Sequence, residues 1–219
     1  MRNHLKFIIY LVLAVVFSSA HAGSYEDWFA ALKRDDPRTI SELLKRGFDA
    51  NTIDPSGRHG LFIALQDGSL KAAEVLVAWP QTKVEWRSAK DESPLMIAAL
   101  KGHKELVKKL IARDADVNKT GWTPLHYAAT AGHLEIIEIL LEEHAYIDAE
   151  SPNKTTPLMM AAEYGSPQAV KLLLEAGADP TLRNELGLSA VDFAQRANRH
   201  DAVALITAAI RKMQPKGKW

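Results

Sequence analysis

The sequence predicts an all-α fold, in which helix–turn–helix units stack into a solenoid with β-turns and loops at its tips. The stretch Thr123–Ala129 has the form of a helix start, and it returns at Thr156–Ala162 and, in a more degenerate form, at Ser93–Ala99. The prolines of these three stretches lie 30 and 33 residues apart. A helix start that recurs at a near-constant period indicates one supersecondary unit copied several times.

The N-terminal segment has the pattern of a secretory signal peptide. A short basic start precedes Phe7–Phe17, a run of apolar or aromatic residues without a charge, and the small residues Ala20 and Ala22 form a cleavage pattern. The apolar run is short for a membrane span. We therefore expect residues 1–22 to be a signal peptide that is cleaved between Ala22 and Gly23. An uncleaved anchor is the alternative.

Each predicted unit begins with a short helix. In Thr123-Pro124 the hydroxyl residue suits the N-cap, where a side-chain oxygen accepts a hydrogen bond from an N–H of the first turn. Proline suits the first helical position, because the N–H that it lacks would be unsatisfied there. We expect the helix to end at Gly132, since a left-handed residue often closes a helix. The same place in other units is taken by Gly68, Gly102, Gly165 and Asn198.

A second helix follows in each unit and carries one apolar stripe. Leu134, Ile137 and Leu140 recur at helical spacing. Gly177 ends one such helix, and His144 stands at the same place one unit earlier, where a left-handed conformation is expected. One helix pair cannot bury its apolar face alone, so neighbouring pairs must stack. Equivalent stripes are formed by Val107, Leu110 and Ile111, by Val170, Leu173 and Leu174, and by Val203, Leu205 and Ile206.

The pattern Thr-Pro-Leu-His-x-Ala at a period of 33 resembles the ankyrin repeat. The resemblance covers residues 25–212 and is strongest at Thr123–Asp148 and Thr156–Asp179. It implies an ankyrin-repeat domain over residues 23–212, followed by a basic tail over 213–219. We expect six units, of which the first and last are atypical caps. Their expected bounds are 25–57, 58–91, 92–121, 122–154, 155–187 and 188–212.

Two junctions depart from the repeat pattern. The loop 118–122 is three residues shorter than its counterparts. Residues 78–86 replace the usual Gly-Ala-Asp ending of a unit, and they carry Trp79 and Trp86. Aromatic side chains are usually buried, which favours a packing role at a poorly formed junction. A binding loop with aromatic anchors is the alternative.

Composition and motifs exclude several classes of function. The 27 basic and 27 acidic side chains balance, so no charge excess points to nucleic acid or to an anionic membrane surface. The chain has no cysteine, which excludes disulfides and thiolate sites. It also lacks GxGxxG, P-loop and HExxH patterns. We therefore expect no enzyme, no cofactor and no metal site.

Three histidines fall at repeated positions of the units. His103 and His133 each follow a glycine, and His126 lies in the helix-start motif. The resemblance to ankyrin repeats implies that such histidines order turns by local hydrogen bonding. We therefore expect them to be structural, because repetition in register is what a repeat fold demands.

The resemblance also implies a surface that binds a protein, since partners of ankyrin repeats usually meet the loop tips and the exposed side of the first helices. The two residues after the Ala-Ala pair of each first helix are expected there. Leu100 and Tyr164 stand out, because exposed apolar groups that cluster tend to mark interfaces. Tyr127, Met160 and Phe193 lie one step deeper and are expected mainly to pack between repeats. The candidate partner-binding residues are Leu100, Lys101, Thr130, Ala131, Glu163, Tyr164, Gln66 and Asp67 on the helices, and Arg87, Lys90, Lys119 and Trp122 at the loop tips, with Asn153 and Glu185 as further tip residues.

These observations predict an exported ankyrin-repeat protein of the bacterial periplasm, with secretion as the alternative location. We expect a monomer without a stable membrane anchor after cleavage, which binds a partner protein of the cell envelope as an accessory or stabilising factor or as an inhibitor. An immunity protein that neutralises a toxic effector is one alternative. A structural envelope protein and an enzyme or small-molecule binder are others, although the register assembles no pocket of convergent polar groups.

Overall fold

The computed structural model describes residues 23–213, which divide into two compact units, residues 23–83 and 84–213. The predicted signal peptide, with Ala22, and residues 214–219 of the predicted tail lie outside the described residues. Within the described residues the regular elements are helices, accompanied by two isolated β-bridges, Ile53–His59 and Arg183–Ser189. The predicted all-α class is therefore confirmed. None of the described helices is long and apolar enough to cross a membrane.

The unit 23–83 contains two helix pairs. Residues 23–33 are helical and are followed by α2 (Pro37–Lys45), α3 (Gly60–Asp67) and α4 (Leu70–Ala78). The ring of Trp28 is fully buried and lies 4.9 Å from the ring of Phe48. Gly60 begins α3 where a Cβ would come within 3.2 Å of the Trp28 ring, so the glycine lets helix and ring approach closely. Trp79 follows α4 and is half-buried.

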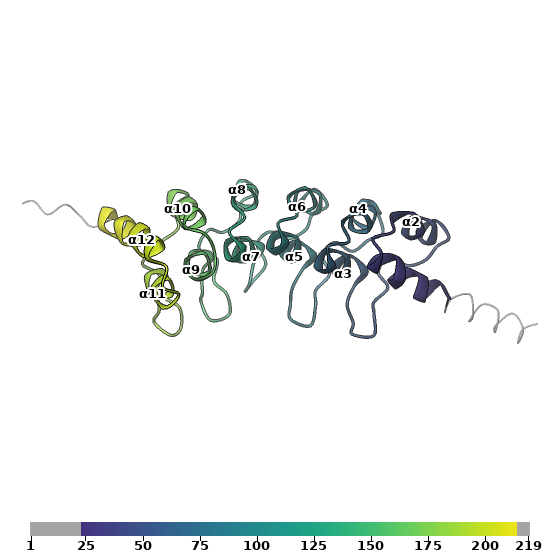
Figure 1. Cartoon of the computed structure of the whole chain (residues 1–219), viewed down its shortest axis with the longest axis horizontal. Coiled ribbons are helices and arrows are strands. Elements are labelled where there is room, and N and C mark those ends of the chain that lie inside the picture. Colours follow the sequence, from purple (N-terminus) through teal and green to yellow (C-terminus); the bar gives the residue numbers. More distant parts are fainter. Residues whose placement is uncertain (1–22, 214–219) are drawn as a thin grey trace, which may run out of the picture. The chain divides into compact units, whose positions relative to one another are not determined.

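The unit 84–213 contains four helix pairs in sequence: α5 (Pro94–Lys101) with α6 (Lys104–Ile111), α7 (Pro124–Ala131) with α8 (Leu134–Glu142), α9 (Pro157–Glu163) with α10 (Pro167–Glu175), and α11 (Ala190–Arg196) with α12 (His200–Met213). The first helices α5, α7, α9 and α11 pack side by side, and so do the second helices α6, α8, α10 and α12 (Figure 1). The helix α12 runs one residue into the predicted tail.

The first helices of this unit begin with reciprocal hydrogen bonds. The hydroxyl of Ser93 accepts from the N–H of Met96 at 3.2 Å, and the Met96 sulfur accepts from the N–H of Ser93 at 3.3 Å. Thr156 caps α9 in the same way. At Thr123 the reciprocal partner is a histidine, because Nδ1 of His126 accepts from the Thr123 N–H at 3.1 Å and lies 2.9 Å from the Thr123 hydroxyl. The ring thus takes the place that the methionine sulfur has at Ser93.

The predicted left-handed helix ends are confirmed with one exception. Gly165 has no positive φ, and the C-cap Tyr164 of α9 is right-handed. A Cβ on Gly165 would lie 2.4 Å from the carbonyl oxygen of Ala129, so the glycine serves close packing between α9 and α7. Positive φ is found as expected at Gly68, Gly102, Gly132, Gly177, His144 and Asn198.

The loops before the first helices share one turn, with a single exception. In the loop before α9, the N–H of Ser151 donates to the carbonyl of Thr155 at 3.0 Å, and Lys154 has a φ of +61°. A second bond runs from the N–H of Lys154 to the carbonyl of Ser151 at 2.8 Å. The same two backbone bonds close the turns 54–58, 88–92 and 184–188. The loop 118–122 before α7 has neither bond, because it is three residues too short, and Figure 1 shows that it projects less than the loop before α9.

Candidate functional site

A shallow hollow of about 280 Å³ lies over the first helices of the unit 84–213. The helices α5, α7 and α9 are adjacent, so the lining combines residues of α7 with one residue from α5 and one from α9. We call it the apolar hollow. Its lining residues are Leu100, Trp122, His126, Tyr127, Thr130 and Met160.

The hydroxyl and imidazole groups of the apolar hollow are already hydrogen-bonded within the protein. The hydroxyl of Tyr127 donates to the Glu92 carboxylate at 3.2 Å, and the hydroxyl of Thr130 donates to the carbonyl of His126 at 2.7 Å. Both ring nitrogens of His126 are also bonded. The hollow therefore offers a ligand mostly carbon surface, supplied by Leu100, Met160 and the aromatic rings.

His126 forms the floor of the hollow, and its imidazole ring is neutral. Since the carbonyl of Thr155 can only accept, Nε2 at 2.8 Å must carry the proton, and Nδ1 accepts from Thr123. Burial lowers the pKa of His126 to about 4. The ring of Trp122 packs edge-on against the His126 ring, with centroids 5.1 Å apart. This contact holds Trp122 at the rim of the hollow.

A second depression, of about 520 Å³, opens beside Trp122 at the loop tips. It lies over the short loop 118–122 and is bounded by the turns 88–92 and 151–155, which both project further (Figure 1). We call it the loop notch. Because Trp122 lines both depressions, the apolar hollow and the loop notch form one continuous surface.

Lys119 is an anchor of the short loop rather than the exposed contact expected from the sequence. Its side chain is only 7% exposed and forms an ion pair with Asp91. The ammonium group also donates to the carbonyl oxygens of Thr120 at 2.7 Å and Trp122 at 3.2 Å. The hydrogen bond from Lys119 lowers the pKa of Asp91. The ammonium thus supplies donors that backbone N–H groups supply in the longer loops.

Besides Asp91, which is exposed but pairs with Lys119, three charged side chains around the loop notch are exposed, namely Lys90, Lys154 and Glu150. Among the described residues, no ion pair joins any of them to another side chain. The charges of Lys119 and Asp91 cancel each other within their ion pair. The notch therefore has two unpaired cations and one unpaired anion.

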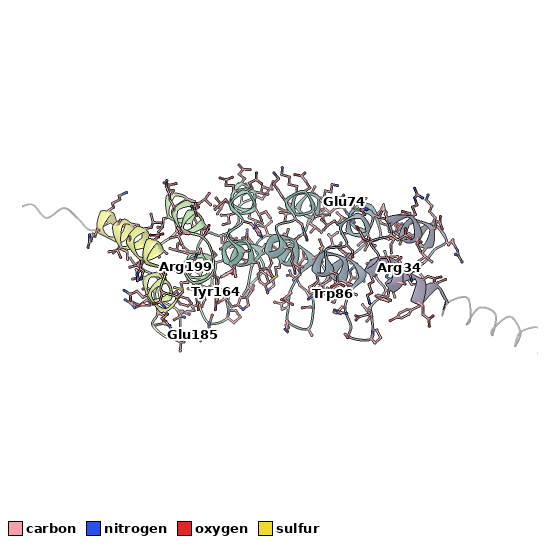
Figure 2. The ribbon with its side chains drawn as sticks, in the orientation of Figure 1. Arg34, Glu74, Trp86, Tyr164, Glu185 and Arg199 are labelled. Carbon is pink, nitrogen blue, oxygen red and sulfur yellow. The ribbon has the colours of Figure 1, made fainter. Side chains whose placement is uncertain are left out.

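The other predicted residues take different places. Lys101 and Ala131 are exposed at the ends of α5 and α7. Tyr164 is 57% exposed at the end of α9, away from the lining of the hollow, and its hydrogen bond with Glu163 raises the pKa of Tyr164 (Figure 2). The backbone carbonyl of the half-buried Glu163 accepts from Arg199 at 3.4 Å.

The remaining loop and helix candidates are dispersed. Gln66 and Asp67 are exposed at the end of α3, in the unit 23–83. Arg87 is half-buried and forms an ion pair with Glu85. Glu185 is exposed at the tip of the loop before α11 (Figure 2), where its N–H donates to the carbonyl of the neighbouring loop residue Asn153 at 3.0 Å.

The structure thus brings together Leu100, Thr130, Trp122, Lys90 and Lys119 from the predicted set. Tyr127 and Met160, expected mainly to pack between repeats, are half-buried and line the hollow. Glu150 and Lys154 were not among the predicted residues. The signal that could have found them is the three-residue deficit of the loop 118–122, which exposes the flanks of both neighbouring turns.

Two further details concern the histidines and the tryptophans. His133 bonds through Nε2 to the carbonyl of Leu100, 3.1 Å away in the preceding repeat, which confirms its structural role. Trp79 and Trp86 are both half-buried, so neither side chain is a fully buried plug or a fully exposed anchor. Within residues 23–213, no three His, Asp or Glu side chains converge so as to hold a metal ion.

The fold and this surface define an ankyrin-type repeat array. A family model described as "Ankyrin repeats (3 copies)" matches residues 28–120, 80–151, 95–184 and 145–214. The chain therefore belongs to the ankyrin repeat family, a general protein–protein interaction module that is typically non-catalytic.

Similar proteins support this assignment. The nuclear factor NF-kappa-B p105 subunit of Gallus gallus is 30% identical over 152 residues, which cover 66% of this chain and 16% of that protein. The neurogenic locus notch homolog protein 1 of Xenopus tropicalis is 33% identical over 129 residues, covering 56% of this chain and 5% of that protein. This chain therefore spans only a small part of the length of these relatives. A crystal structure of an ankyrin repeat domain from Acinetobacter baumannii AYE superposes with a TM-score of 0.70 at 25% identity, covering 83% of this chain and 96% of that one.

Proposed function

We propose that this chain is an exported ankyrin-repeat protein that binds one partner protein of the cell envelope, as an accessory or stabilising factor or as an inhibitor. The observation that carries the proposal is the apolar hollow, an exposed carbon surface between Leu100, Tyr127 and Met160. Covering such a surface with a partner is favourable, because it removes apolar area from water. The hollow is built on packed helices, so little ordering free energy is lost on binding.

Binding rather than catalysis follows from the state of the polar groups. An enzyme or a small-molecule site needs a few convergent polar groups that are free to meet the ligand. In the apolar hollow, the hydroxyls of Tyr127 and Thr130 and both nitrogens of His126 are committed to internal bonds. The surface is therefore suited to exclude water against an apolar side chain.

The proposed location in the periplasm, or outside the cell, is supported by the pattern of residues 1–22. The absence of cysteine makes the chain indifferent to an oxidising compartment. The same surface serves an accessory factor or an immunity protein. A captured enzyme that gains activity or lifetime in the complex identifies the former, and a captured toxin that loses activity identifies the latter.

The test is capture of the partner from the envelope fraction with variants of the hollow. The tagged chain is crosslinked and recovered, and the bound proteins are identified by mass spectrometry. Leu100→Lys and Met160→Lys should lose the partner that the unmodified chain captures. Ile139→Lys is the matched control, since Ile139 is also half-buried but lies on the second helix α8. Equal recovery of the partner by the hollow variants, at unchanged circular dichroism, would refute the proposal.

A further inference from the structure

The geometry points to the kind of partner: we propose that the surface binds an extended acidic segment, whose apolar side chain fills the hollow while a carboxylate a few residues away lies in the loop notch. This inference rests on the proposed function and specifies its ligand. It combines three observations on the unit 84–213, which are the size of the hollow, the charges of the notch and the continuity of the two.

The size and chemistry of the hollow select one apolar side chain. Its volume of about 280 Å³ is just below the range of about 300–1,000 Å³ typical of small-molecule pockets. A polar side chain placed there would lose its water and find few partners, because the hydroxyl protons of Tyr127 and Thr130 are already donated within the protein. A large aliphatic or aromatic side chain meets no such cost.

The charges of the loop notch select a carboxylate. Lys90 and Lys154 stand on the turns 88–92 and 151–155, on opposite sides of the notch, and neither has a carboxylate partner. Each turn is closed by backbone hydrogen bonds, so the two lysines start from fixed positions. Of the two carboxylates of the notch, Asp91 pairs with Lys119 and only Glu150 opposes the two lysines. An Asp or Glu of the segment would therefore enter a site of net positive charge.

The continuity of the surface requires an extended segment. Trp122 forms the common wall of the hollow and the notch, and its position is set by the His126 ring and by the Lys119 ammonium. The short loop before α7 lies between the turns 88–92 and 151–155, which both project beyond it (Figure 1). A helix or a flat protein surface would meet the projecting turns on either side, whereas an extended chain passes between them.

The experiment is selection of peptides on the purified chain. A phage-displayed library of random twelve-residue peptides is panned, and the enriched peptides are synthesised and their Kd measured by calorimetry. We expect enrichment of a large apolar residue followed within a few positions by Asp or Glu. The double variant Lys90→Glu/Lys154→Glu should weaken binding at least tenfold, Leu100→Lys should abolish it, and Glu150→Gln should strengthen it. The double variant Lys108→Glu/Lys171→Glu, on α6 and α10, should leave the Kd unchanged.

Two outcomes would overturn this inference. One is the absence of any enriched peptide, or enrichment without acidic residues. The other is an unchanged Kd in the Lys90→Glu/Lys154→Glu variant. Either result leaves the proposed function standing if capture of the envelope partner still depends on Leu100 and Met160. If capture of the partner does not depend on the residues of the hollow, both the proposed function and this inference are refuted.

Discussion

Replacing His126 with methionine should remove one source of pH dependence from the unit 84–213. The change is conservative, because methionine occupies the same place in the neighbouring repeats, where the Met96 sulfur accepts the N–H of the cap residue. At neutral pH the variant should be less stable by about 1–3 kcal/mol, because the buried carbonyl of Thr155 loses its donor from Nε2.

The pH dependence follows from the pKa of His126, which burial lowers from 6.5 to about 4. The folded protein holds the ring neutral, whereas the unfolded chain takes up a proton below about pH 6.5. The stability from the neutral ring is complete above pH 6.5 and is lost as the pH falls toward about 4. At about 1.4 kcal/mol per pH unit, this interval amounts to about 3 kcal/mol.

The assay is urea unfolding of both proteins between pH 8 and pH 4.5, followed by circular dichroism. His59, whose pKa burial also lowers to about 4, is present in both proteins and cancels from the difference. The free energy of unfolding of the parent, minus that of His126→Met, should fall by about 2–3 kcal/mol over this range. Parallel stability curves would show that the buried imidazole does not titrate as argued.

Three further outcomes are expected. Leu140→Ala should lower the free energy of unfolding by about 2–5 kcal/mol, because the Leu140 side chain is fully buried on α8. Leu141→Ala should lower it less, because Leu141 is half-buried. Equal losses for the two variants in denaturant unfolding would contradict the assignment of the buried face of α8. Gly165→Ala should lower the melting temperature, since its Cβ would lie 2.4 Å from the Ala129 carbonyl oxygen, and an unchanged melting curve would show that α9 and α7 can separate. Sequencing of the exported protein should find Gly23 at its N-terminus, and retention of Met1 would disprove the cleavage site.

Much of the fold is predictable from the sequence, because each helix start and end is set by local chemistry. Ser93-Pro94 and Gly102 mark a first helix through capping and a left-handed end, and both hold in the structure. The exception at Gly165 is instructive. A glycine needed for φ and a glycine needed for space look alike in a sequence, and only the position of the Ala129 carbonyl separates them.

The candidate site is less predictable, because it depends on what neighbouring repeats do to one another. Lys119 has the sequence context of a loop tip, yet the shortened loop turns its ammonium group inward to the carbonyls of Thr120 and Trp122. Lys154, one repeat later, is exposed and lines the notch over the short loop. The sequence marks the three missing residues but not the direction in which the remaining side chains turn.

The shortened loop also has a consequence for the time course of recognition. A ligand that must pass between the turns 88–92 and 151–155 meets the surface in only a narrow range of orientations. Such a constraint holds association below the diffusion limit, to about 10⁵–10⁷ M⁻¹s⁻¹ for ordinary protein pairs. Differences in affinity among its ligands should therefore lie mainly in how long each complex lasts. The three residues missing before α7 would in this way limit the association rate common to all ligands and leave the residence time to distinguish them.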